Sequence, residues 1–299
     1  MKKLVVFGSL NMDLSIESDH MPTLGETIVG KGFITNPGGK GANQSVAAAK
    51  LGAQVYHVGS VGVDAFGDQM LSAMEDAGVN CEFVVRSEKA PTGVALITRV
   101  GGDNFITIDS GANFVTNSSD VCTALDSLAV PGDVFLAQLE CDFETTWASL
   151  IEAHKRGMYV ALNPAPAHEI PDEVLTCLDM VAVNEIECET ISGIYPGDAS
   201  SAQKAADALM EKGVGCVVIT LGARGSLVFK GKDMIESIPP KVNAIDTTCA
   251  GDTYIGALLS AYVRGLSLEE GVEFATKASA LATTTVGAQQ SIPTLEMVQ

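Results

Sequence analysis

Short apolar runs alternate with helical patterns along most of this chain of 299 residues, and this alternation constrains its fold more than any other feature. The runs read as strands buried on both faces, and the segments between them repeat apolar residues at the period of a helix. The predicted strands are residues 3–8, 55–61, 134–139, 159–162, 180–183 and 217–221, and the predicted helices are 43–51, 66–77, 145–154, 202–212 and 252–263. The pattern predicts an α/β fold with a doubly wound, mostly parallel sheet flanked by helices.

Two segments, at about 12–36 and about 91–110, interrupt this alternation with strand patterns that no helix separates. The first contains a predicted strand at 27–34, and the second contains a predicted hairpin around the turn at 101–104. We expect these strands to form a small β-sheet lid that stands off the main sheet. The alternative is that they are antiparallel edge strands of that same sheet.

The chain carries no Pro/Ser-rich linker, low-complexity tract or internal repeat, so we expect a single domain over residues 1–299. A small sheet that stands off the core has an apolar face that one chain does not cover. This favours a homodimer that forms through the lid.

Charge and composition narrow the class of partner. The chain has 18 Lys and Arg against 37 Asp and Glu, a formal net charge of −19, which repels nucleic acid and anionic membranes. No apolar run approaches the ~20 residues that cross a bilayer, and the first apolar stretch is too short for a signal peptide. The seven cysteines form no C-x-x-C pair, and the four histidines have no metal-binding spacing. We therefore expect a cytoplasmic protein with free thiols, and with no zinc, nucleic-acid or membrane partner.

Several common motifs are absent from the sequence. It contains no G-x-x-x-x-G-K-[ST], which excludes a P-loop enzyme, and no G-x-G-x-x-G follows its first strand, which disfavours a dinucleotide oxidoreductase. A G-x-S-x-G elbow is also missing, which disfavours an α/β-hydrolase.

The segment 244–254 offers a site for an anion. Two small residues, Ala250 and Gly251, lead into a predicted helix, so their free N–H groups would lie at its positive end and suit a phosphoryl group. Asp252 lies in the first turn, where its carboxylate can accept a proton from an attacking hydroxyl. The alternative is an ordinary first-turn acid that the helix dipole favours.

The segment 36–43 and the end of the first strand offer groups for a polyol. Glycines in 36–43 let the backbone approach a ligand closely, and Lys40 and Asn43 are donors, although a plain turn before a helix also explains the glycines. Asn11 and Asp13 follow the first strand, where a carboxylate can accept from two neighbouring hydroxyls, but both are also ordinary turn residues. Other strands of the sheet end at further polar or glycine-rich positions, namely Glu140, Asn184, Glu185, Glu187 and the 220–225 segment.

On these residues the chain resembles the ribokinase-like (PfkB) carbohydrate kinase family over almost its whole length. The segments 38–43 and 246–253 carry the most specific part of the likeness, while 109–113 and 163–167 are more typical of the ribokinase branch. The resemblance implies transfer of the γ-phosphoryl of MgATP to a sugar hydroxyl, with the 5-hydroxyl of D-ribose as the first candidate. Alternatives are deoxyribose, a hexose or a nucleoside, or a non-catalytic sugar or nucleotide sensor, which an intact Asp252 disfavours.

The resemblance also implies a role for each matching residue. Asp252 matches the catalytic base, with Ala250 and Gly251 in the anion hole. The sugar site would comprise Asn11, Asp13, Gly39, Lys40, Asn43 and Glu140, and the nucleotide site Asn184, Thr220, Gly222 and Gly225. Glu187 would hold Mg²⁺ through water, and a monovalent cation, K⁺ in the first place, would lie by Asp246, Thr248, Ala282, Thr285, Gly287 and Ser291.

The sequence departs from the family pattern at three places. Position 249, commonly Gly, is Cys, and position 254, commonly Phe, is Tyr. We expect Cys249 to require an ordinary backbone conformation where glycine would not. The segment 283–287 lacks the basic residues expected near it.

Overall fold

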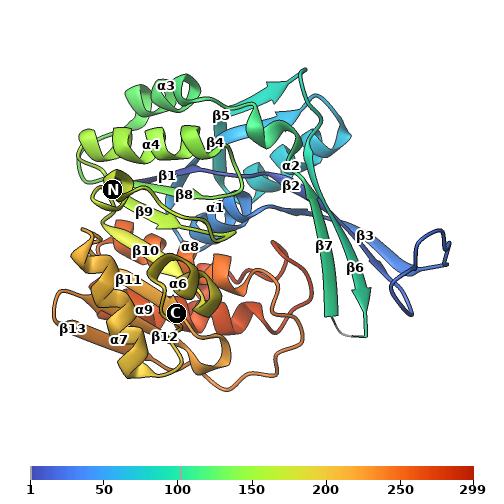
Figure 1. Cartoon of the computed structure of the whole chain (residues 1–299). Coiled ribbons are helices and arrows are strands. Elements are labelled where there is room, and N and C mark those ends of the chain that lie inside the picture. The colour runs from blue at the N-terminus through green and yellow to red at the C-terminus, as the bar shows by residue number, and fades with distance from the viewer. Residues whose placement is uncertain (1, 102) are drawn as a thin grey trace.

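A nine-stranded sheet runs through the molecule in the order β13-β12-β11-β10-β9-β8-β1-β4-β5 (Figure 1). The structure, a computed structural model, describes residues 2–101 and 103–299. The strands from β11 to β5 are parallel, and β12 and β13 continue the sheet antiparallel. Their bounds are β1 Lys3–Phe7, β4 Gln54–Gly62, β5 Val79–Ser87, β8 Val134–Gln138, β9 Tyr159–Asn163, β10 Met180–Val183, β11 Val217–Thr220, β12 Ser226–Lys230 and β13 Asp233–Ser237. The predicted mostly parallel sheet is confirmed.

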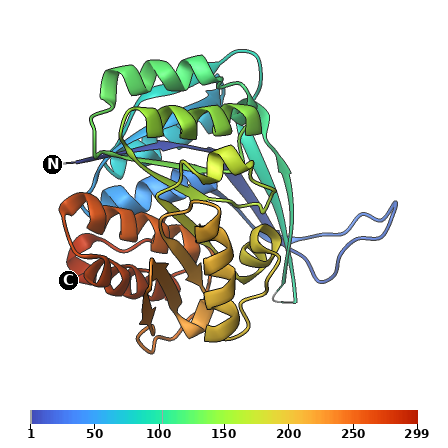
Figure 2. The same cartoon turned by 60° about the vertical axis from the view of Figure 1, so that its left-hand side comes forward.

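Helices cover both faces of this sheet, and alternate residues of β1 enter two separate cores. Leu4 and Val6 pack with α1 (Lys40–Lys50), α2 (Ala65–Asp76), α8 (Ala250–Arg264), α9 (Leu268–Ala282) and α10 (Leu295–Val298). Val5 and Phe7 pack with α3 (Ser118–Leu128), α4 (Phe143–Lys155), α5 (Asp172–Leu175), α6 (Glu185–Ser192) and α7 (Ala199–Glu211). Figure 2 shows the green α3 and α4 on one side of β1 and the blue α1 on the other. This two-sided burial explains why the strands are apolar without alternation.

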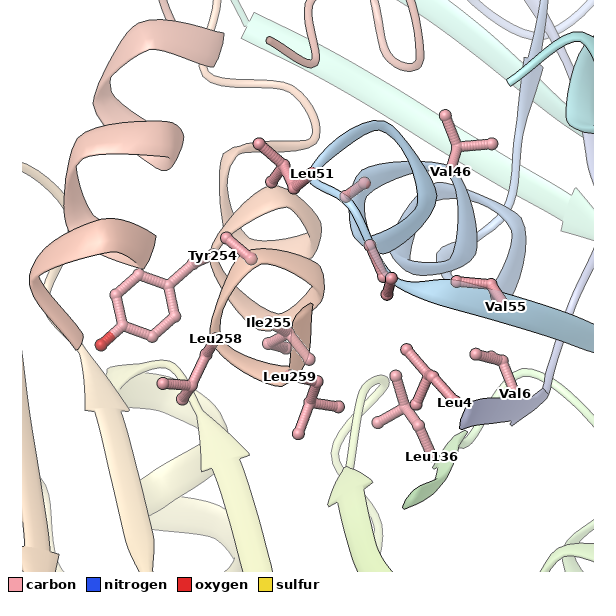
Figure 3. Packing of buried hydrophobic residues seen from close by; sticks show 14 of the residues in the cluster. Leu4, Val6, Val46, Leu51, Val55, Leu136, Tyr254, Ile255, Leu258 and Leu259 are labelled. Atoms are coloured by element: carbon pink, nitrogen blue, oxygen red, sulfur yellow. The ribbon is translucent and has the colours of Figure 1, made fainter. Parts of the chain in front are cut away.

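The close packing of α1 against α8 fixes the two helix starts that matter for the site. Leu51 and Val55 lie on the α1 side of this core, and Ile255 and Leu259 project from α8 (Figure 3). A Cβ atom added at Gly256 would lie 2.6 Å from Cβ of Ala47, so only glycine fits at this crossing. Residues 40–44 and 250–252 are thereby held side by side.

The strand order changes direction beside β1. From β1 the chain builds β4 and β5 on one side, and it then returns to build β8, β9, β10 and β11 on the other. Ligands of such sheets bind outside the carboxyl ends of the strands near this point. The site residues predicted from the sequence follow β1, β8, β10 and β11, so they meet at this edge.

A second sheet, of four strands in the order β3-β2-β6-β7, stands apart from the first (Figure 1). Its strands are β2 Asn11–Glu17, β3 Lys31–Gly38, β6 Gly93–Val100 and β7 Asp103–Asp109. The predicted separate sheet is confirmed, and the alternative of edge strands in the main sheet is wrong. The strand expected at 27–34 begins only at Lys31, because residues 27–30 belong to the long connection after β2.

In residues 2–101 and 103–299 the remaining elements are the short 3₁₀ helices η1 (Gly111–Phe114) and η2 (Gly222–Arg224). None of the helices in the described ranges has both the length and the apolar character needed to span a bilayer.

Candidate active site

Glu140 ties the ends of β1 and β8 to the start of α1. One of its carboxylate oxygens, Oε2, accepts from Oγ of Ser9 at 2.5 Å and from the backbone N–H of Lys40 at 3.1 Å. Oγ of Ser9 in turn accepts from the N–H of Gly41 at 3.3 Å. The predicted sugar-site residues Lys40 and Glu140 are therefore neighbours, and Ser9, which the sequence did not single out, links them.

The glycine segment before α1 presses against the turn between β1 and β2. Gly39 has a φ of 88°, and an added Cβ would lie 2.8 Å from the backbone nitrogen of Asn11. At Gly38 a Cβ would lie 2.3 Å from a carboxylate oxygen of Asp13. The glycines thus allow the close approach expected from the sequence, and they bring α1 up to Asn11 and Asp13.

Asn11 is buried, and a second buried amide, Asn113, fixes its orientation. Asn113 accepts from the N–H of Leu10 at 2.8 Å, so its Nδ2 faces Oδ1 of Asn11, to which it donates at 2.7 Å. Sequence reasoning used Asn113 only as part of a segment typical of one branch of a family. The signal for Asn113 that the sequence does contain is an asparagine just after the predicted strands of the small sheet.

The carboxylate of Asp13 stands among other negative charges. Burial raises its pKa to about 7, and the nearby charges of Glu140 and Asp252 add to the rise. Burial would lower the pKa of Lys40, but the charges of Asp252, Glu140 and Glu187 outweigh it and raise that pKa. This end of the site is acidic, with Lys40 as its cation.

Asp252 lies in the first turn of α8, and the two predicted anion-hole residues, Ala250 and Gly251, begin that helix. The N–H of Ala250 is not free as predicted, because it donates to the carbonyl of Thr247 at 3.2 Å in the turn that leads into α8. Oδ2 of Asp252 accepts from Nδ2 of Asn43 at 3.0 Å, and its Oδ1 accepts from Nε2 of Gln44 at 2.9 Å. The base predicted from the sequence therefore meets the predicted sugar-site residue Asn43 from α1.

Cys249, just before α8, corrects one expectation. Its φ of 66° and ψ of 3° lie in the left-handed region, whereas the sequence led us to expect an ordinary conformation. The sharp entry into α8 imposes this conformation although it costs a residue with a side chain about 1–2 kcal/mol. The other departure, Tyr254, places its hydroxyl 2.8 Å from Oγ of Ser226, so the extra oxygen has a buried partner.

Two adjoining cavities run from these groups along the sheet edge. The smaller, of about 160 Å³, is lined by Lys40, Glu187, Gly251 and Asp252, among others. The larger, of about 650 Å³, extends from Gly251 to the 239–242 segment. Both are lined by Asn184, Thr220 and Gly251, so the smaller cavity, which Asp252 lines, adjoins a space large enough for a nucleotide.

All four residues predicted for the nucleotide site line the larger cavity: Asn184, Thr220, Gly222 and Gly225. Two of them have a positive φ, 57° at Gly222 and 93° at Gly225. A Cβ atom at Gly225 would lie only 1.9 Å from the carbonyl oxygen of Ser237, so this turn requires glycine.

Glu187 faces the smaller cavity while it caps its own helix. Its Oε2 accepts from the N–H of Asn184 and its Oε1 from Nδ2 of Asn184, both at 2.9 Å. Burial raises its pKa, although the Asn184 N–H and Lys40 oppose the shift. A single carboxylate at this place fits Mg²⁺, which proteins hold largely through water and substrate phosphates.

Asp246 links the loop before α8 to the segment after α9. Its Oδ1 accepts from the N–H of Thr248 and its Oδ2 from the N–H of Gly287, both at 2.9 Å. Burial would raise the pKa of Asp246, but these N–H groups hold it below its usual value. Three of the residues predicted for a monovalent cation are thus brought together.

The remaining members of that predicted set lie in the same C-terminal segment. The carbonyl of Ala282 accepts from the N–H of Thr285 at 3.3 Å, and Oγ of Ser291 donates to the carbonyl of Ala288 at 2.8 Å. Carboxylate, hydroxyl and carbonyl oxygens are the donor types that suit an alkali cation.

Comparison with known proteins places the chain in a family. A family model described as pfkB family carbohydrate kinase matches residues 1–295. The chain belongs to this family. The ribokinase of Haemophilus influenzae is 39% identical over 295 residues, which cover 98% of this chain and 96% of that protein. A structure of Arabidopsis thaliana ribokinase complexed with ribose and ATP matches with a TM-score of 0.91 and 32% identity, covering 99% of this chain and 97% of that one.

A further relative of this carbohydrate kinase is named for a different sugar. A deoxyribokinase of Salmonella typhi is 34% identical over 296 residues, which cover 98% of this chain and 96% of that protein. The resemblance drawn from the sequence motifs is confirmed at the level of the family.

Proposed function

We propose that this carbohydrate kinase transfers the γ-phosphoryl of MgATP to the 5-hydroxyl of D-ribose, with Asp252 as the general base. The position of the Asp252 carboxylate carries the proposal. This carboxylate lies at the start of α8. It lies between the acidic residues of the proposed sugar site and a cavity of about 650 Å³. Ribokinases from several organisms are the relatives that support D-ribose as the acceptor.

The acidic end of the site is proposed to bind the sugar. Its donors and acceptors are Asn11, Asp13, Gly39, Lys40, Asn43 and Glu140. An ionised carboxylate has about four acceptor positions, and the hydroxyls of a neutral sugar can donate to those that the protein's own donors leave open. A sugar phosphate would instead bring a second anion against Asp13 and Glu140, so we propose an unphosphorylated acceptor.

The larger cavity is proposed to bind the nucleotide through Asn184, Thr220, Gly222 and Gly225. The sugar oxygen forms a bond to the γ-phosphorus while the bond from that phosphorus to the bridging oxygen breaks, and ADP leaves. The hydroxyl proton passes to Asp252. The N–H of Gly251, at the positive end of α8, stabilises the charge on the transferring phosphoryl, and the N–H of Ala250 joins it on release from the carbonyl of Thr247.

Two cations complete the proposal. Mg²⁺, held by the phosphates and through water by Glu187, would neutralise charge on the transferring group. K⁺ would bind by Asp246, Thr248, Ala282, Thr285, Gly287 and Ser291 and stabilise the loop behind the anion hole. Equal kcat values in K⁺, Na⁺ and a bulky organic cation at equal ionic strength would reject the K⁺ site.

We also propose a homodimer through the small sheet. In the register of this sheet, Ile97 pairs with Ile106 and Ala95 with Ile108, on the face that carries Asp13. Ile106 and Ile108 remain 57% and 45% exposed in one chain, and Phe105 on the opposite face is 48% exposed. A second copy would cover such side chains.

The seven free cysteines support a reducing, cytoplasmic location.

A panel of sugars tests the substrate. With MgATP, kcat/KM should be highest for D-ribose, lower for 2-deoxyribose and lowest for hexoses. A higher kcat/KM for 2-deoxyribose would make 2-deoxyribose the substrate in place of D-ribose. The proposed phosphoryl transfer would be unchanged. ADP formation that no sugar stimulates would overturn the proposed function.

A further inference from the structure

The catalytic carboxylate is held from behind by a glutamine that no substrate can reach. Gln44 lies on α1 and has no exposed surface, and its Nε2 donates both to Oδ1 of Asp252 and to Oδ1 of Asn163, each at 2.9 Å. Sequence reasoning passed over this residue because a glutamine in an alanine-rich helix carries no motif of its own.

A backbone carbonyl fixes which end of the Gln44 amide faces the base. The carbonyl of Ala182, in β10, can only accept, and Nδ2 of Asn163 donates to it at 2.9 Å. Oδ1 of Asn163 therefore faces Gln44 and requires its NH₂ group. The other end of that amide, Oε1, accepts from Nε2 of Gln138 in β8 at 2.7 Å. Each orientation in this chain of amides follows from the carbonyl, so the donor of Gln44 points at Asp252.

The second donor to Asp252 differs from Gln44 in what else it can do. Asn43 donates to Oδ2, but its own Oδ1 is buried and has no hydrogen-bond partner within residues 2–101 and 103–299. An amide with an unused acceptor beside the proposed sugar site can turn to a sugar hydroxyl. Gln44 has partners for both ends of its amide and stays where it is.

We propose that Gln44 is a positioning residue that holds Oδ1 of Asp252, so that Oδ2 is the oxygen that takes the proton from the sugar. The inference rests on the proposed function through the role of Asp252 as the base. A carboxylate held at one oxygen keeps one rotamer and presents the other oxygen to the acceptor hydroxyl. Loss of this hold lowers kcat and leaves the KM values for sugar and ATP nearly unchanged, because Gln44 contacts neither substrate.

The test is a double-mutant cycle between Gln44→Met and Asp252→Asn. Methionine keeps the volume of glutamine and removes the donor. We expect Gln44→Met alone to lower kcat by about 10- to 100-fold, the effect of losing one hydrogen bond to a charged group. In the Asp252→Asn background the same change should lower the residual kcat by less than about 2-fold, because the carboxylate it positions is gone.

Gln44→Glu and Ser45→Ala complete the set. Gln44→Glu keeps the shape, places a carboxyl oxygen against Oδ1 of Asp252, and should lower kcat at pH 8 at least as much as Gln44→Met. Ser45 is the next residue on α1, fully buried and 2.8 Å from Nδ1 of His57, so Ser45→Ala should lower the melting temperature and keep kcat.

The outcomes separate this inference from the proposed function. Equal losses of kcat from Gln44→Met in both backgrounds, a loss confined to KM, or full activity of Gln44→Glu would each overturn the positioning role. Activity with a sugar other than ribose would change only the substrate, and the cycle is then measured with that sugar. Full activity of Asp252→Asn would overturn the base assignment and this inference together.

Discussion

The two ends of the candidate active site, the proposed sugar end and the proposed nucleotide end, are built in opposite ways. At the sugar end, side chains are linked to one another before any ligand arrives, as Ser9 is to Glu140, Asn113 to Asn11, and Gln44 to Asp252. At the nucleotide end, a cavity of about 650 Å³ is lined largely by small residues, and glycines 222 and 225 shape its turns. The sugar end therefore consists of side chains that hydrogen bonds hold in place, and the nucleotide end is a preformed cavity.

This difference shows which end of the site contains groups that lower the stability of the folded protein. Asp13, Glu140 and Asp252 crowd the sugar end, and burial without a ligand raises the pKa of Asp13 to about 7. The nucleotide end carries no comparable group of carboxylates among the residues described as lining it. Variants of the carboxylates at the sugar end should therefore trade binding against stability, whereas a variant at an open position of the nucleotide end, such as Gly251, should change binding alone.

The largest effect is expected at the boundary between the two ends. Asp252→Asn should keep the fold and nucleotide binding and lower kcat by ~10²–10⁴-fold, because the amide cannot accept the proton. The measurement is kcat at saturating sugar and MgATP, with ATP affinity from calorimetry as the control. A variant with more than about a tenth of the wild-type kcat would show that Asp252 is not the base.

Asp13→Ala tests whether the sugar end acts on the sugar alone. Loss of a charged hydrogen bond should raise the KM for the sugar by about 10- to 100-fold, and the KM for ATP should stay nearly unchanged. Steady-state kinetics with each substrate varied in turn separates the two. A change in the KM for ATP alone would place Asp13 at the wrong end of the site.

Gly251→Ala tests the nucleotide end in the same way. A Cβ atom at Gly251 meets no atom within 4 Å, so the variant should fold with unchanged or slightly higher stability. The methyl group borders both cavities and should lower kcat/KM for ATP by about 10-fold, or about 1.4 kcal/mol.

The matched control is Gly256→Ala, five residues further along the same helix. Its Cβ would lie 2.6 Å from Cβ of Ala47, which should cost about 1–3 kcal/mol of stability. Equal melting temperatures for the two variants would contradict the packing described here. Unchanged ATP kinetics in Gly251→Ala would remove Gly251 from the phosphoryl path.

The smallest effect concerns the stability of the sugar-free protein. An acid with a raised pKa contributes stability that is complete below its ordinary value of 3.8 and is lost as pH rises through about 7. This contribution of Asp13 should therefore lower the melting temperature of the wild type progressively between about pH 4 and pH 7 and leave it level above pH 7, and Asp13→Asn should reduce that fall. Identical pH dependence in the two proteins would show that Asp13 titrates normally.

The sequence predicted the large sheet well because both faces of its strands are buried, which leaves an unbroken apolar run. It also predicted that the candidate site residues would lie near one another, since polar side chains at the carboxyl ends of parallel strands must share one edge. Gln44 and Asn113 were missed because their roles depend on partners about 100 or more positions away, Asp252 and Asn11. The prediction for Cys249 was wrong because the sharp entry into α8, and not the residue type, sets its backbone conformation.

The most direct test of the central claim is the identity of the product. The protein is incubated with MgATP and D-ribose labelled with ¹³C at C5, and carbon and phosphorus NMR follow the reaction together with ADP release. We expect one phosphomonoester on the 5-oxygen for each ADP formed, and little ADP without sugar. A phosphate on any other oxygen, or ADP formed without a phosphorylated sugar, would overturn the proposed function.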